Sequence, residues 1–438
     1  MIKLENIKKV YFIGIGGIGV SAIARMMLLE EKVVSGSDES PSEITKELEK
    51  KGAKVFGRHN AQNLADDTDL VVYTVAIDKD NPELSKAKKL GIKALTYSQM
   101  LGTVSDGYYT VAVAGTHGKT TTTAMLAKVA IDAGLDPTVI VGSLLLSTSL
   151  GTSKSLESNL IVGNSNLFIV EACEYNRSFL DLKPNILVIT NVDSDHLDYY
   201  KDLTDIQNAF TELANKLGEK DFLVCNPEDE KVAPAVKNVK CKIIDYSLGN
   251  LIPKLKVPGE YNQENAKAAF AIAEILKVEK EKTFSSLQEF EGVWRRFEYK
   301  GETQNGAEVY DDYAHHPTEI RAALRATHKK FPNRKIIVVF QPHLYSRTRL
   351  LLKDMADSFS DADEVLVAPI YAAREEEDLS INSSILAEEI EKNGKKAKSY
   401  KDFSEIEAYL RESAKKGNII ITMGAGDIYK IAENLIKS

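Results

Sequence analysis

The sequence predicts an α/β protein built from mostly parallel sheets with helices packed against them. Short apolar runs rich in β-branched residues recur along the chain, longer amphipathic stretches separate them, and two of the strand-to-helix turns are rich in glycine. The 438 residues suffice for several domains. The 43% apolar and 27% charged content is typical of a globular protein with packed cores.

Three blocks of alternating strands and helices are expected: residues 1–106, 107–295 and 296–438. In the first block, strands are expected near residues 9–14, 33–38 and 69–76, with a helix over 20–29. In the second, strands are expected at 109–114, 167–172, 185–192 and 221–226, with helices over 120–133 and 264–276. In the third, strands are expected at 335–342, 364–369 and 418–427.

Composition excludes several classes of protein. The net charge is −8 and the basic residues are dispersed, so we expect no nucleic-acid partner. Only three cysteines occur, which favours neither a disulfide framework nor a thiolate zinc site. We find no signal peptide and no apolar run of membrane-spanning length, so we expect a cytoplasmic protein without membrane insertion.

The segment V-A-V-A-G-T-H-G-K-T-T-T-T, residues 111–123, lies between a predicted strand and a predicted helix. A common phosphate loop, G-x-x-x-x-G-K-[ST], would need glycine at position 113, where this chain has Val113. The flanks nevertheless favour phosphate binding, because backbone N–H groups at a helix N-terminus bind phosphate oxygens. Lys119 would neutralise phosphate charge and Thr120 would bind Mg²⁺. The alternative is a tight turn with an incidental lysine.

A second glycine loop, G-I-G-G-I-G at residues 14–19, also follows a strand and precedes a helix. It matches G-x-G-x-x-G, and Asp38 ends the next strand at a separation that suits a ribose contact. Taken alone, the loop would suggest a nicotinamide dinucleotide. A glycine-rich turn without a ligand is the alternative. Two such loops indicate two phosphorylated ligands, one of them ATP.

Polar clusters follow several of the other predicted strands. Glu171 and Glu174 follow one strand, and N-V-D-S-D-H-L-D at residues 191–198 follows another, with His196 as a ligand or catalytic group. D-D-Y-A-H-H-P-T-E (311–319) and Q-P-H-L-Y-S-R-T-R (341–349) each end a strand of the third block. Ligands bind open α/β sheets at the carboxyl ends of their strands, so these clusters are candidate site residues.

These motifs, in this order and over essentially the whole chain, resemble those of the Mur ligases of peptidoglycan synthesis. The resemblance is carried by G-T-H-G-K-T-T, E-A-C-E, N-x-D-x-D-H-x-D, Y-N-x-x-N-A, R-R-F-E, D-D-Y-A-H-H-P-T-E and Q-P-H-x-Y-S-R. It implies three domains: a Rossmann-like UDP-sugar domain, a central P-loop-type ATPase and a Rossmann-like C-terminal domain. It also implies that the shortened loop is the family's own form.

Roles for individual residues are also implied by the resemblance. ATP would be bound by Gly115, Thr116, Gly118, Lys119, Thr120, Thr121, Asn262, Asn265, Arg296 and Asp312. The UDP-sugar would be bound by Gly14, Gly16, Gly17, Gly19 and Asp38, with His117 near the sugar-acid carboxylate. The amino acid would be bound by Tyr313, His343 and Arg347, and the metal by Thr120, Glu171 and His196. Lys119, His196, His117 and Arg347 would take part in catalysis.

Within the family, G-I-G-G-I-G together with H-H-P-T-E resembles the members that join L-alanine to the lactyl carboxylate of UDP-N-acetylmuramate. This implies ATP and Mg²⁺ as cofactors, an acyl-phosphate intermediate, and a monomer or homodimer. His196 is a candidate for the base that accepts the amine proton. Leu344 stands where an arginine is common, Cys173 and Asn176 replace acids, and residues 143–168 fit the family poorly.

Other functions remain open at this point. The nearest is a ligase that attaches a preformed murein tripeptide to the same UDP-sugar, which would share both loops. A nicotinamide-dependent dehydrogenase would use only the first loop and would leave G-K-T-T and D-H unexplained. The sequence does not separate L-alanine, L-serine and glycine as the amino acid.

Overall fold

The computed structural model describes residues 4–40, 42–145, 158–197, 199–249, 252–373 and 375–437. Two compact units are formed, and each is described by itself. The first unit comprises Met1–Asp193, Leu203–Leu251 and Lys267–Leu287; the second comprises Ser194–Asp202, Ile252–Ala266 and Gln288–Ser438. Asp198 of the D-H motif, and residues 146–157 within the poorly fitting stretch, lie outside the described residues.

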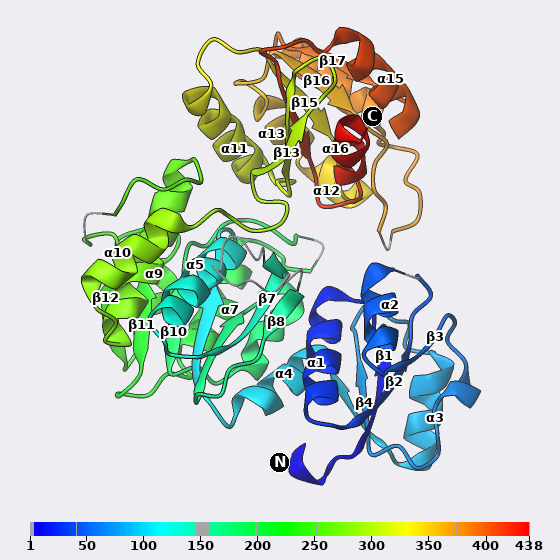
Figure 1. The fold of residues 1–438 in the computed structure, drawn as a ribbon, viewed down its shortest axis with the longest axis vertical. Coiled ribbons are helices and arrows are strands. Elements are labelled where there is room, and N and C mark those ends of the chain that lie inside the picture. Colours follow the sequence, from blue (N-terminus) through cyan, green and yellow to red (C-terminus); the bar gives the residue numbers. More distant parts are fainter. Residues whose placement is uncertain are drawn as a thin grey trace. The chain divides into compact units, whose positions relative to one another are not determined.

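The first unit opens with a parallel sheet in the order β3-β2-β1-β4-β5 (Figure 1). Its strands are β1 (Lys9–Ile13), β2 (Val33–Ser37), β3 (Lys54–Phe56), β4 (Leu70–Tyr73) and β5 (Lys93–Thr96). Its helices are η1 (Leu4–Asn6), α1 (Ile18–Leu29), α2 (Glu43–Lys50), η2 (Ala61–Asn63), α3 (Pro82–Leu90) and α4 (Tyr97–Ser105). Tyr11 and Ile13 of β1 pack with Leu84 and Ala87 of α3, so this helix covers one face of the sheet.

A second sheet follows in the same unit, in the order β12-β11-β10-β6-β9-β7-β8. Its strands are β6 (Tyr109–Ala114), β7 (Thr138–Leu145), β8 (Ser158–Ile161), β9 (Leu167–Glu171), β10 (Ile186–Ile189), β11 (Phe222–Cys225) and β12 (Lys242–Asp245). The helical segments associated with it are α5 (Lys119–Asp132), η3 (Tyr175–Asp181), α7 (Leu203–Ala214), α8 (Ala233–Val236), α9 (Glu260–Ile275) and α10 (Lys280–Glu289). Strand β6 lies at the centre and is buried from its second residue, which places the loop that follows it at the middle of the sheet's carboxyl edge.

The second unit contains a sheet in the order β13-β14-β18-β15-β16-β17. Its strands are β13 (Glu298–Glu302), β14 (Glu308–Asp312), β15 (Ile336–Phe340), β16 (Glu364–Val367), β17 (Lys396–Ser399) and β18 (Ile419–Met423). Its helices are α11 (Pro317–Lys330), α12 (Tyr345–Leu350), α13 (Leu352–Asp357), α14 (Ser383–Lys392), α15 (Phe403–Ser413) and α16 (Tyr429–Ile436).

Both faces of this third sheet are covered by helices. Because side chains alternate along a strand, Ile336, Val338 and Phe340 of β15 pack with α11, α13 and α14. Ile337 and Val339 of the same strand pack with α15 and α16 on the other face. Strands buried on both faces are continuous apolar runs, which is the pattern that predicted them.

The expected fold class is confirmed, and every strand named from the sequence has a counterpart in the structure. The main departures are the edge strands β8 and β13, which pair antiparallel with β7 and β14. The basic run at residues 395–398 enters β17 at Lys396. Among the described residues, no helix combines the length and apolarity needed to cross a bilayer.

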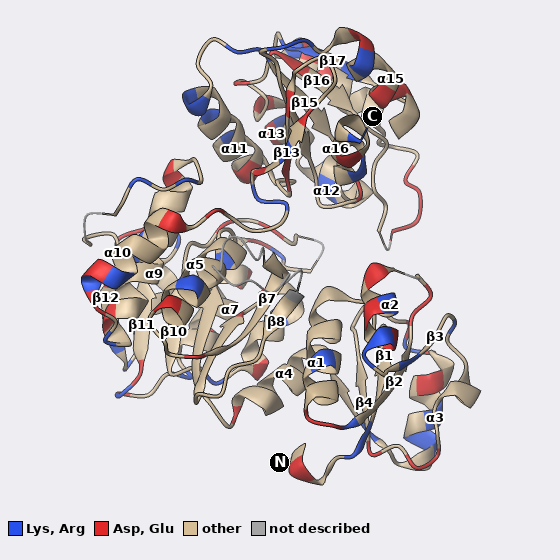
Figure 2. Cartoon of the chain, viewed as in Figure 1, with Lys and Arg blue, Asp and Glu red and all other residues tan. Residues whose placement is uncertain are grey.

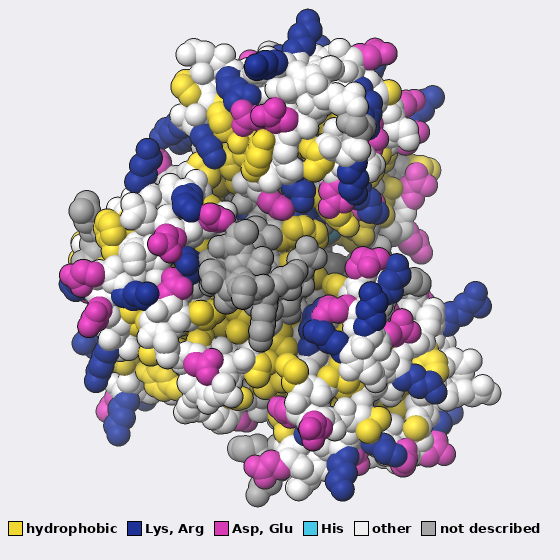
Figure 3. Space-filling view, viewed as in Figure 1, with side chains coloured by type: hydrophobic (Ala, Val, Ile, Leu, Met, Phe, Trp, Pro, Cys, Tyr) yellow, Lys and Arg dark blue, Asp and Glu magenta, His cyan; other side chains and the backbone are white. Residues whose placement is uncertain are grey.

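Charged residues are dispersed over the chain. Lysine and arginine (blue) and aspartate and glutamate (red) both occur on the elements around each sheet (Figure 2). The face drawn in Figure 3 likewise intersperses the two signs over the described residues.

Candidate active site

The glycines of G-T-H-G-K-T are required by the backbone that they form. Gly115 has φ +136°, and a Cβ added to it would lie 1.9 Å from the hydroxyl oxygen of Thr190. Gly118 has φ +82° and caps helix α5. Both angles fall in the region that favours glycine. The loop therefore turns sharply from β6 into α5, within fewer residues than a common phosphate loop.

Residues at the end of β10 hold this loop from outside. The Thr190 hydroxyl donates to the His117 carbonyl at 2.6 Å, and the Asn191 side-chain amide donates to the same carbonyl at 3.0 Å. The Asn191 side-chain carbonyl accepts the His117 N–H at 2.9 Å, and its main-chain carbonyl accepts the Thr116 N–H at 3.1 Å. The loop is thus braced by its neighbouring strand before any ligand binds.

Lys119 lies at the centre of the loop. Its ammonium donates to the carbonyls of Gly115 at 2.6 Å and Thr116 at 3.0 Å, and lies 2.8 Å from a carboxylate oxygen of Glu174. Burial lowers the pKa of Lys119, but Glu174, with smaller contributions from Cys173 and Glu171, raises it overall. The side chain is therefore a cation at neutral pH, as phosphate binding requires.

Thr120 and Glu171 form an oxygen pair beside the lysine. The Thr120 hydroxyl donates to Glu171 Oε1 at 3.0 Å, and Glu171 Oε2 accepts the Gly142 N–H at 2.7 Å. A hydroxyl and a carboxylate are hard ligands that suit Mg²⁺, so these residues fit the metal implied by the resemblance. Thr121 follows in the first turn of α5 and is buried.

His117 lies at the apex of the same loop. Its Nε2 is 3.4 Å from Asp193 Oδ2, and the other carboxylate oxygen of Asp193 accepts from Lys231 at 2.7 Å. The structure therefore brings His117, Lys119, Thr120 and Glu171 together around one loop in the first unit. The role assigned to each stays a prediction.

The first glycine loop is closed by different groups. The Ser37 carbonyl accepts the N–H groups of Gly14 at 2.8 Å and Ile15 at 3.1 Å. The Asp38 carboxylate accepts the Gly16 N–H at 2.8 Å. The backbone of Gly17 caps α1, and a Cβ on Gly19 would collide with the ring of Tyr97. Asp38 therefore stabilises the backbone of the glycine loop, a role separate from the ribose contact expected from the sequence.

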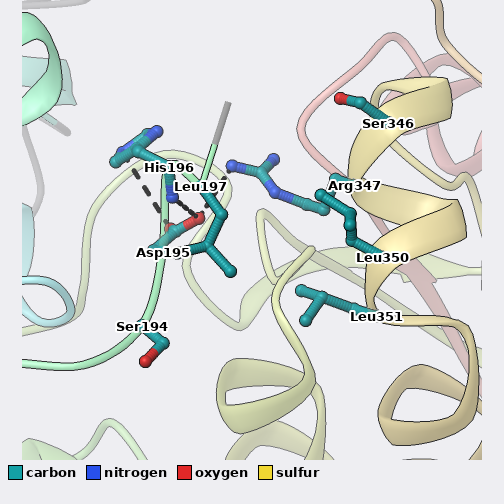
Figure 4. Close-up of a pocket in the computed structure, with 8 residues that line it drawn as sticks. All are labelled: Ser194, Asp195, His196, Leu197, Ser346, Arg347, Leu350 and Leu351. Carbon is teal, nitrogen blue, oxygen red and sulfur yellow. Dashed lines mark hydrogen bonds and ion pairs between the residues drawn. The ribbon is translucent and has the colours of Figure 1, made fainter. Parts of the chain in front are cut away.

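The second unit contains a pocket lined by Ser194, Asp195, His196, Leu197, Ser346, Arg347, Leu350 and Leu351 (Figure 4). Arg347 of α12 donates to Asp195 Oδ1 at 2.9 Å, and both side chains are buried. Burial raises the pKa of Asp195, but His196 and Arg347 outweigh it and hold the carboxyl ionised. His196 has φ +54°, and its N–H donates to the Asp195 carboxylate at 2.6 Å.

Aromatic and imidazole rings line the approach to Arg347. Arg347 donates to His343 Nδ1 at 3.2 Å, and the His343 ring stacks on Tyr371 with centroids 5.7 Å apart. His315 lies between Tyr313 and His343, at 5.6 Å and 5.8 Å. Burial lowers the pKa of His315 to about 4, so its ring is neutral near pH 7.

The residues expected to contact ATP in this unit surround β14. The Arg296 guanidinium lies 5.2 Å from the Tyr313 ring centroid and 3.8 Å from Glu319. The Asp312 carboxylate accepts the N–H groups of Phe297 and Ala314 at 2.8 Å and 2.7 Å, and burial raises the pKa of Asp312 to about 6.

Asn262 and Asn265 lie near the start of α9, where the Asn265 amide donates to Asn262 at 3.2 Å and the Asn262 amide donates to the Pro258 carbonyl at 2.6 Å. Among all the predicted metal ligands, Thr120 and Glu171 meet in the first unit, whereas His196 belongs to the second.

Sequence reasoning counted Glu174, Asn191 and Asp195 only as members of polar clusters and did not name Thr190 or Tyr371, although all five organise these sites. Thr190 and Asn191 brace the phosphate loop, Glu174 pairs with Lys119, Asp195 pairs with Arg347 and Tyr371 stacks on His343. Asp195, Asn191 and Glu174 stand in the polar runs that follow strands, so their position was a usable signal. Thr190 and Tyr371 gave no such signal.

A glycine loop braced around a buried lysine, with a hydroxyl and a carboxylate beside it, places the chain among P-loop-type nucleotide-binding proteins of the α/β class. Three family models match it: the Mur ligase family catalytic domain over residues 9–109, the Mur ligase middle domain over 113–252, and the Mur ligase glutamate ligase domain over 295–426. The chain belongs to the Mur ligase family.

Individual relatives agree with this assignment. The chain is 43% identical to the UDP-N-acetylmuramate–L-alanine ligase of Clostridium kluyveri over 97% of both chains. It is 42% identical to the ligase of the same name from Clostridium novyi, over 99% of this chain and 98% of the other. The crystal structure of a UDP-N-acetylmuramate–alanine ligase from Thermotoga maritima superimposes with a TM-score of 0.79, at 29% identity and 98% coverage of each chain. A murein peptide ligase from Psychrobacter arcticus shares the fold, with a TM-score of 0.72 at 23% identity and the same coverage.

Proposed function

We propose that this chain catalyses the ATP-dependent ligation of L-alanine to the lactyl carboxylate of UDP-N-acetylmuramate. The observation that carries the proposal is the 42–43% identity, over nearly the whole chain, to ligases that bear this activity in their names. The braced phosphate loop and the buried arginine supply the chemistry that such a reaction needs.

In the first half of the reaction, a lactyl carboxylate oxygen attacks the γ-phosphorus of ATP, and the bond to the β-phosphate oxygen breaks. ADP leaves and an acyl phosphate forms. Lys119 would neutralise the charge that spreads over the transferred phosphoryl group, and the N–H groups at the start of α5 would bind its oxygens. The brace from Thr190 and Asn191 supports this role, because the N–H groups then need no rearrangement.

Mg²⁺ would be held by Thr120 and Glu171, with His196 as a further candidate ligand. When bound, the metal would neutralise phosphate charge and orient the phosphoryl group. The Thr120–Glu171 hydrogen bond supports the assignment, because it aligns both oxygens beside the lysine.

In the second half, the neutral amine of L-alanine attacks the acyl carbon and the bond to the phosphate oxygen breaks, which releases phosphate. The amine must also lose a proton. His196, in the second unit, is the candidate acceptor, and metal binding by the same imidazole would compete with this role. Arg347 would bind the amino-acid carboxylate, since a guanidinium fork matches that group. The Asp195 carboxylate holds Nη2 of Arg347 at 2.9 Å and His343 Nδ1 lies 3.2 Å from Nη1, which supports this role because both contacts fix the orientation of the guanidinium. Tyr313 and His343 would complete the amino-acid site.

The UDP portion would be bound by the first glycine loop. Gly14, Gly16, Gly17 and Gly19 would let the nucleotide diphosphate approach the N-terminus of α1, and Asp38 would contact the ribose. Gly16 and Asp38 are joined by a hydrogen bond, which supports a shared role.

Phosphate release from ATP tests the proposal. The purified chain is incubated with ATP, Mg²⁺ and UDP-N-acetylmuramate, with and without L-alanine, L-serine, glycine or the murein tripeptide. We expect release that depends on both the UDP-sugar and L-alanine. Release that ignored L-alanine and required the tripeptide would replace the proposal with the murein peptide ligase. Reduction of a nicotinamide dinucleotide without phosphate release would replace it with a dehydrogenase.

A further inference from the structure

A buried carboxylate lies behind the carboxyl edge of the first sheet, on residues that the proposed reaction does not use. Glu83, in the first turn of α3, has a fully buried side chain. Its Oε1 accepts from the Tyr11 hydroxyl at 2.7 Å and the Asn63 amide at 2.9 Å. Its Oε2 accepts from the Ser37 hydroxyl at 2.6 Å and lies 3.3 Å from Nδ1 of His59. So many donors fix one orientation of the carboxylate.

The hydrogen bonds also fix the ring of His59. Its Nδ1 lies 2.8 Å from the Ser37 hydroxyl oxygen. That hydroxyl carries a single hydrogen, which it donates to Glu83, so it can only accept from the ring. Nδ1 therefore carries the proton, and in the neutral ring Nε2 is a hydrogen-bond acceptor.

This ring lies beside the first glycine loop. His59 follows β3, and Ser37 ends β2, the neighbouring strand (Figure 1). The carbonyl of Ser37 accepts from Gly14 and Ile15, while the carboxylate of Asp38 accepts from Gly16. The His59 side chain is 17% exposed, whereas that of Glu83 is 0% exposed. Glu83 thus lies behind a partly accessible imidazole at the edge where open α/β sheets bind nucleotides.

We propose that His59 contacts the nucleoside of the UDP-sugar, with Nε2 accepting a hydrogen bond from an O–H or N–H group, and that Glu83 is the residue that positions it. The proposal rests on the proposed function for the identity of the ligand. The nucleoside carries such donors, on the ribose hydroxyls and on N3 of uracil, whereas an ionised diphosphate carries acceptors only. The end of β2 and the loop after β3 lie on the side of the glycine loop where a Rossmann-like fold places the nucleoside.

Two substitutions of His59 test the roles of its two ring nitrogens separately. His59→Asn places an amide near Nδ1, which keeps a donor for Ser37 but removes the acceptor at Nε2. His59→Gln places its amide near Nε2 and can still accept. Isothermal titration with UDP is expected to show about tenfold weaker binding by His59→Asn and a smaller loss by His59→Gln. The melting temperature of His59→Asn should stay close to that of the unmodified chain. His328→Asn, an exposed histidine of α11, is the matched control.

Nucleotide analogues identify the group that His59 contacts. The titration is repeated with 2′-deoxy-UDP, 3′-deoxy-UDP and 3-methyl-UDP. The analogue that lacks the partner should bind the unmodified chain more weakly and should lose no further affinity on His59→Asn, as in a double-mutant cycle. Inorganic pyrophosphate should bind both proteins equally. Unchanged UDP binding by His59→Asn overturns the proposal, as does an equal loss for pyrophosphate, which would place the contact on the phosphates.

Positioning by Glu83 has its own readout. Glu83→Gln replaces one acceptor with a donor facing the hydroxyl of Ser37 or Tyr11. The expected result is a several-fold higher KM for UDP-N-acetylmuramate, with kcat and the KM for ATP unchanged. If Glu83→Gln does not fold, Ser37→Ala, which removes the hydroxyl between Glu83 and His59, should give the same KM effect. A loss confined to kcat, or an unchanged KM, overturns the positioning role. Failure of the proposed function would instead show as inactivity of the unmodified chain.

Discussion

The two glycine loops of the first unit share a local design and differ in what surrounds them. Each leaves a buried strand and enters a helix, and each needs glycine at a positive φ, +78° at Gly14 and +136° at Gly115. The first is closed by the Ser37 carbonyl and the Asp38 carboxylate, whereas the second is closed by Thr190 and Asn191 and surrounds Lys119. Glycine spacing therefore specifies a turn, whereas the charged side chains beside the turn differ between the two glycine loops.

Lys119→Ala is the substitution that should distinguish the functions of the two loops most clearly. We expect kcat for phosphate release to fall about 10³-fold or more, because the cation beside the transferred phosphoryl group is lost. UDP binding, measured by titration calorimetry, should change by less than about twofold. Lys240→Ala, an exposed lysine, is the control. Loss of UDP binding together with turnover would show that the loops do not act on separate ligands.

Gly115→Ala should have the next largest effect. Its Cβ would overlap the Thr190 hydroxyl at 1.9 Å and would sit at φ +136°, so we expect a loss of stability on the order of 2–4 kcal/mol and severe loss of turnover. Gly134→Ala is matched, since Gly134 has φ +74° with open space around it, and should cost only about 1 kcal/mol. Thermal unfolding compares the two. Equal costs would mean that backbone strain alone requires glycine at position 115.

A smaller effect is expected at the other loop for Asp38→Ala. Without the carboxylate, the Gly16 N–H loses its acceptor, so the KM for UDP-N-acetylmuramate should rise about tenfold while the KM for ATP stays unchanged. Asp38→Asn keeps an oxygen acceptor, so its KM for UDP-N-acetylmuramate should lie between those of the unmodified chain and Asp38→Ala. Steady-state kinetics with each substrate varied in turn would decide it, and a change in the KM for ATP would contradict the separation of the loops.

Gly17→Ala should leave stability nearly unchanged. Gly17 has φ −64°, and an added Cβ would meet nothing closer than the Gly14 carbonyl at 3.4 Å. The expected cost is below about 1 kcal/mol. The KM for the UDP-sugar should rise several-fold, because the proposed site needs the diphosphate to approach the backbone at this position. An unchanged KM in a stable variant would mean that the ligand does not occupy the space of that methyl group.

The fold could be predicted from sequence because buried parallel strands are continuous apolar runs, as in β6, β10 and β15. The edge strands could not. Glu298–Glu302 of β13 is mostly polar, and β8 (S-N-L-I) is half polar, so both are defined by their partners and not by their own composition. Candidate site residues were found where a polar run directly follows a strand, as with Glu171 and Arg347.

Residues that act through tertiary contacts could not be identified from the sequence pattern. Thr190 is a β-branched residue in a strand-like run, and only the structure places its hydroxyl on the His117 carbonyl. Likewise, Glu83 and His59 stand 24 positions apart in polar surroundings, and their pairing depends on how α3 packs against β1 and η2. Sequence periodicity carries no information on such pairs.

The brace between β10 and the phosphate loop has a consequence for hydrogen exchange and for grafting. The amide hydrogens of Thr116 and His117 are bonded to Asn191, so they should exchange slowly with solvent even before nucleotide is added. The proposed nucleotide binding would then meet little conformational entropy cost in this loop. A transplanted G-T-H-G-K-T would lack that rigidity unless a threonine and an asparagine came with it on the adjacent strand.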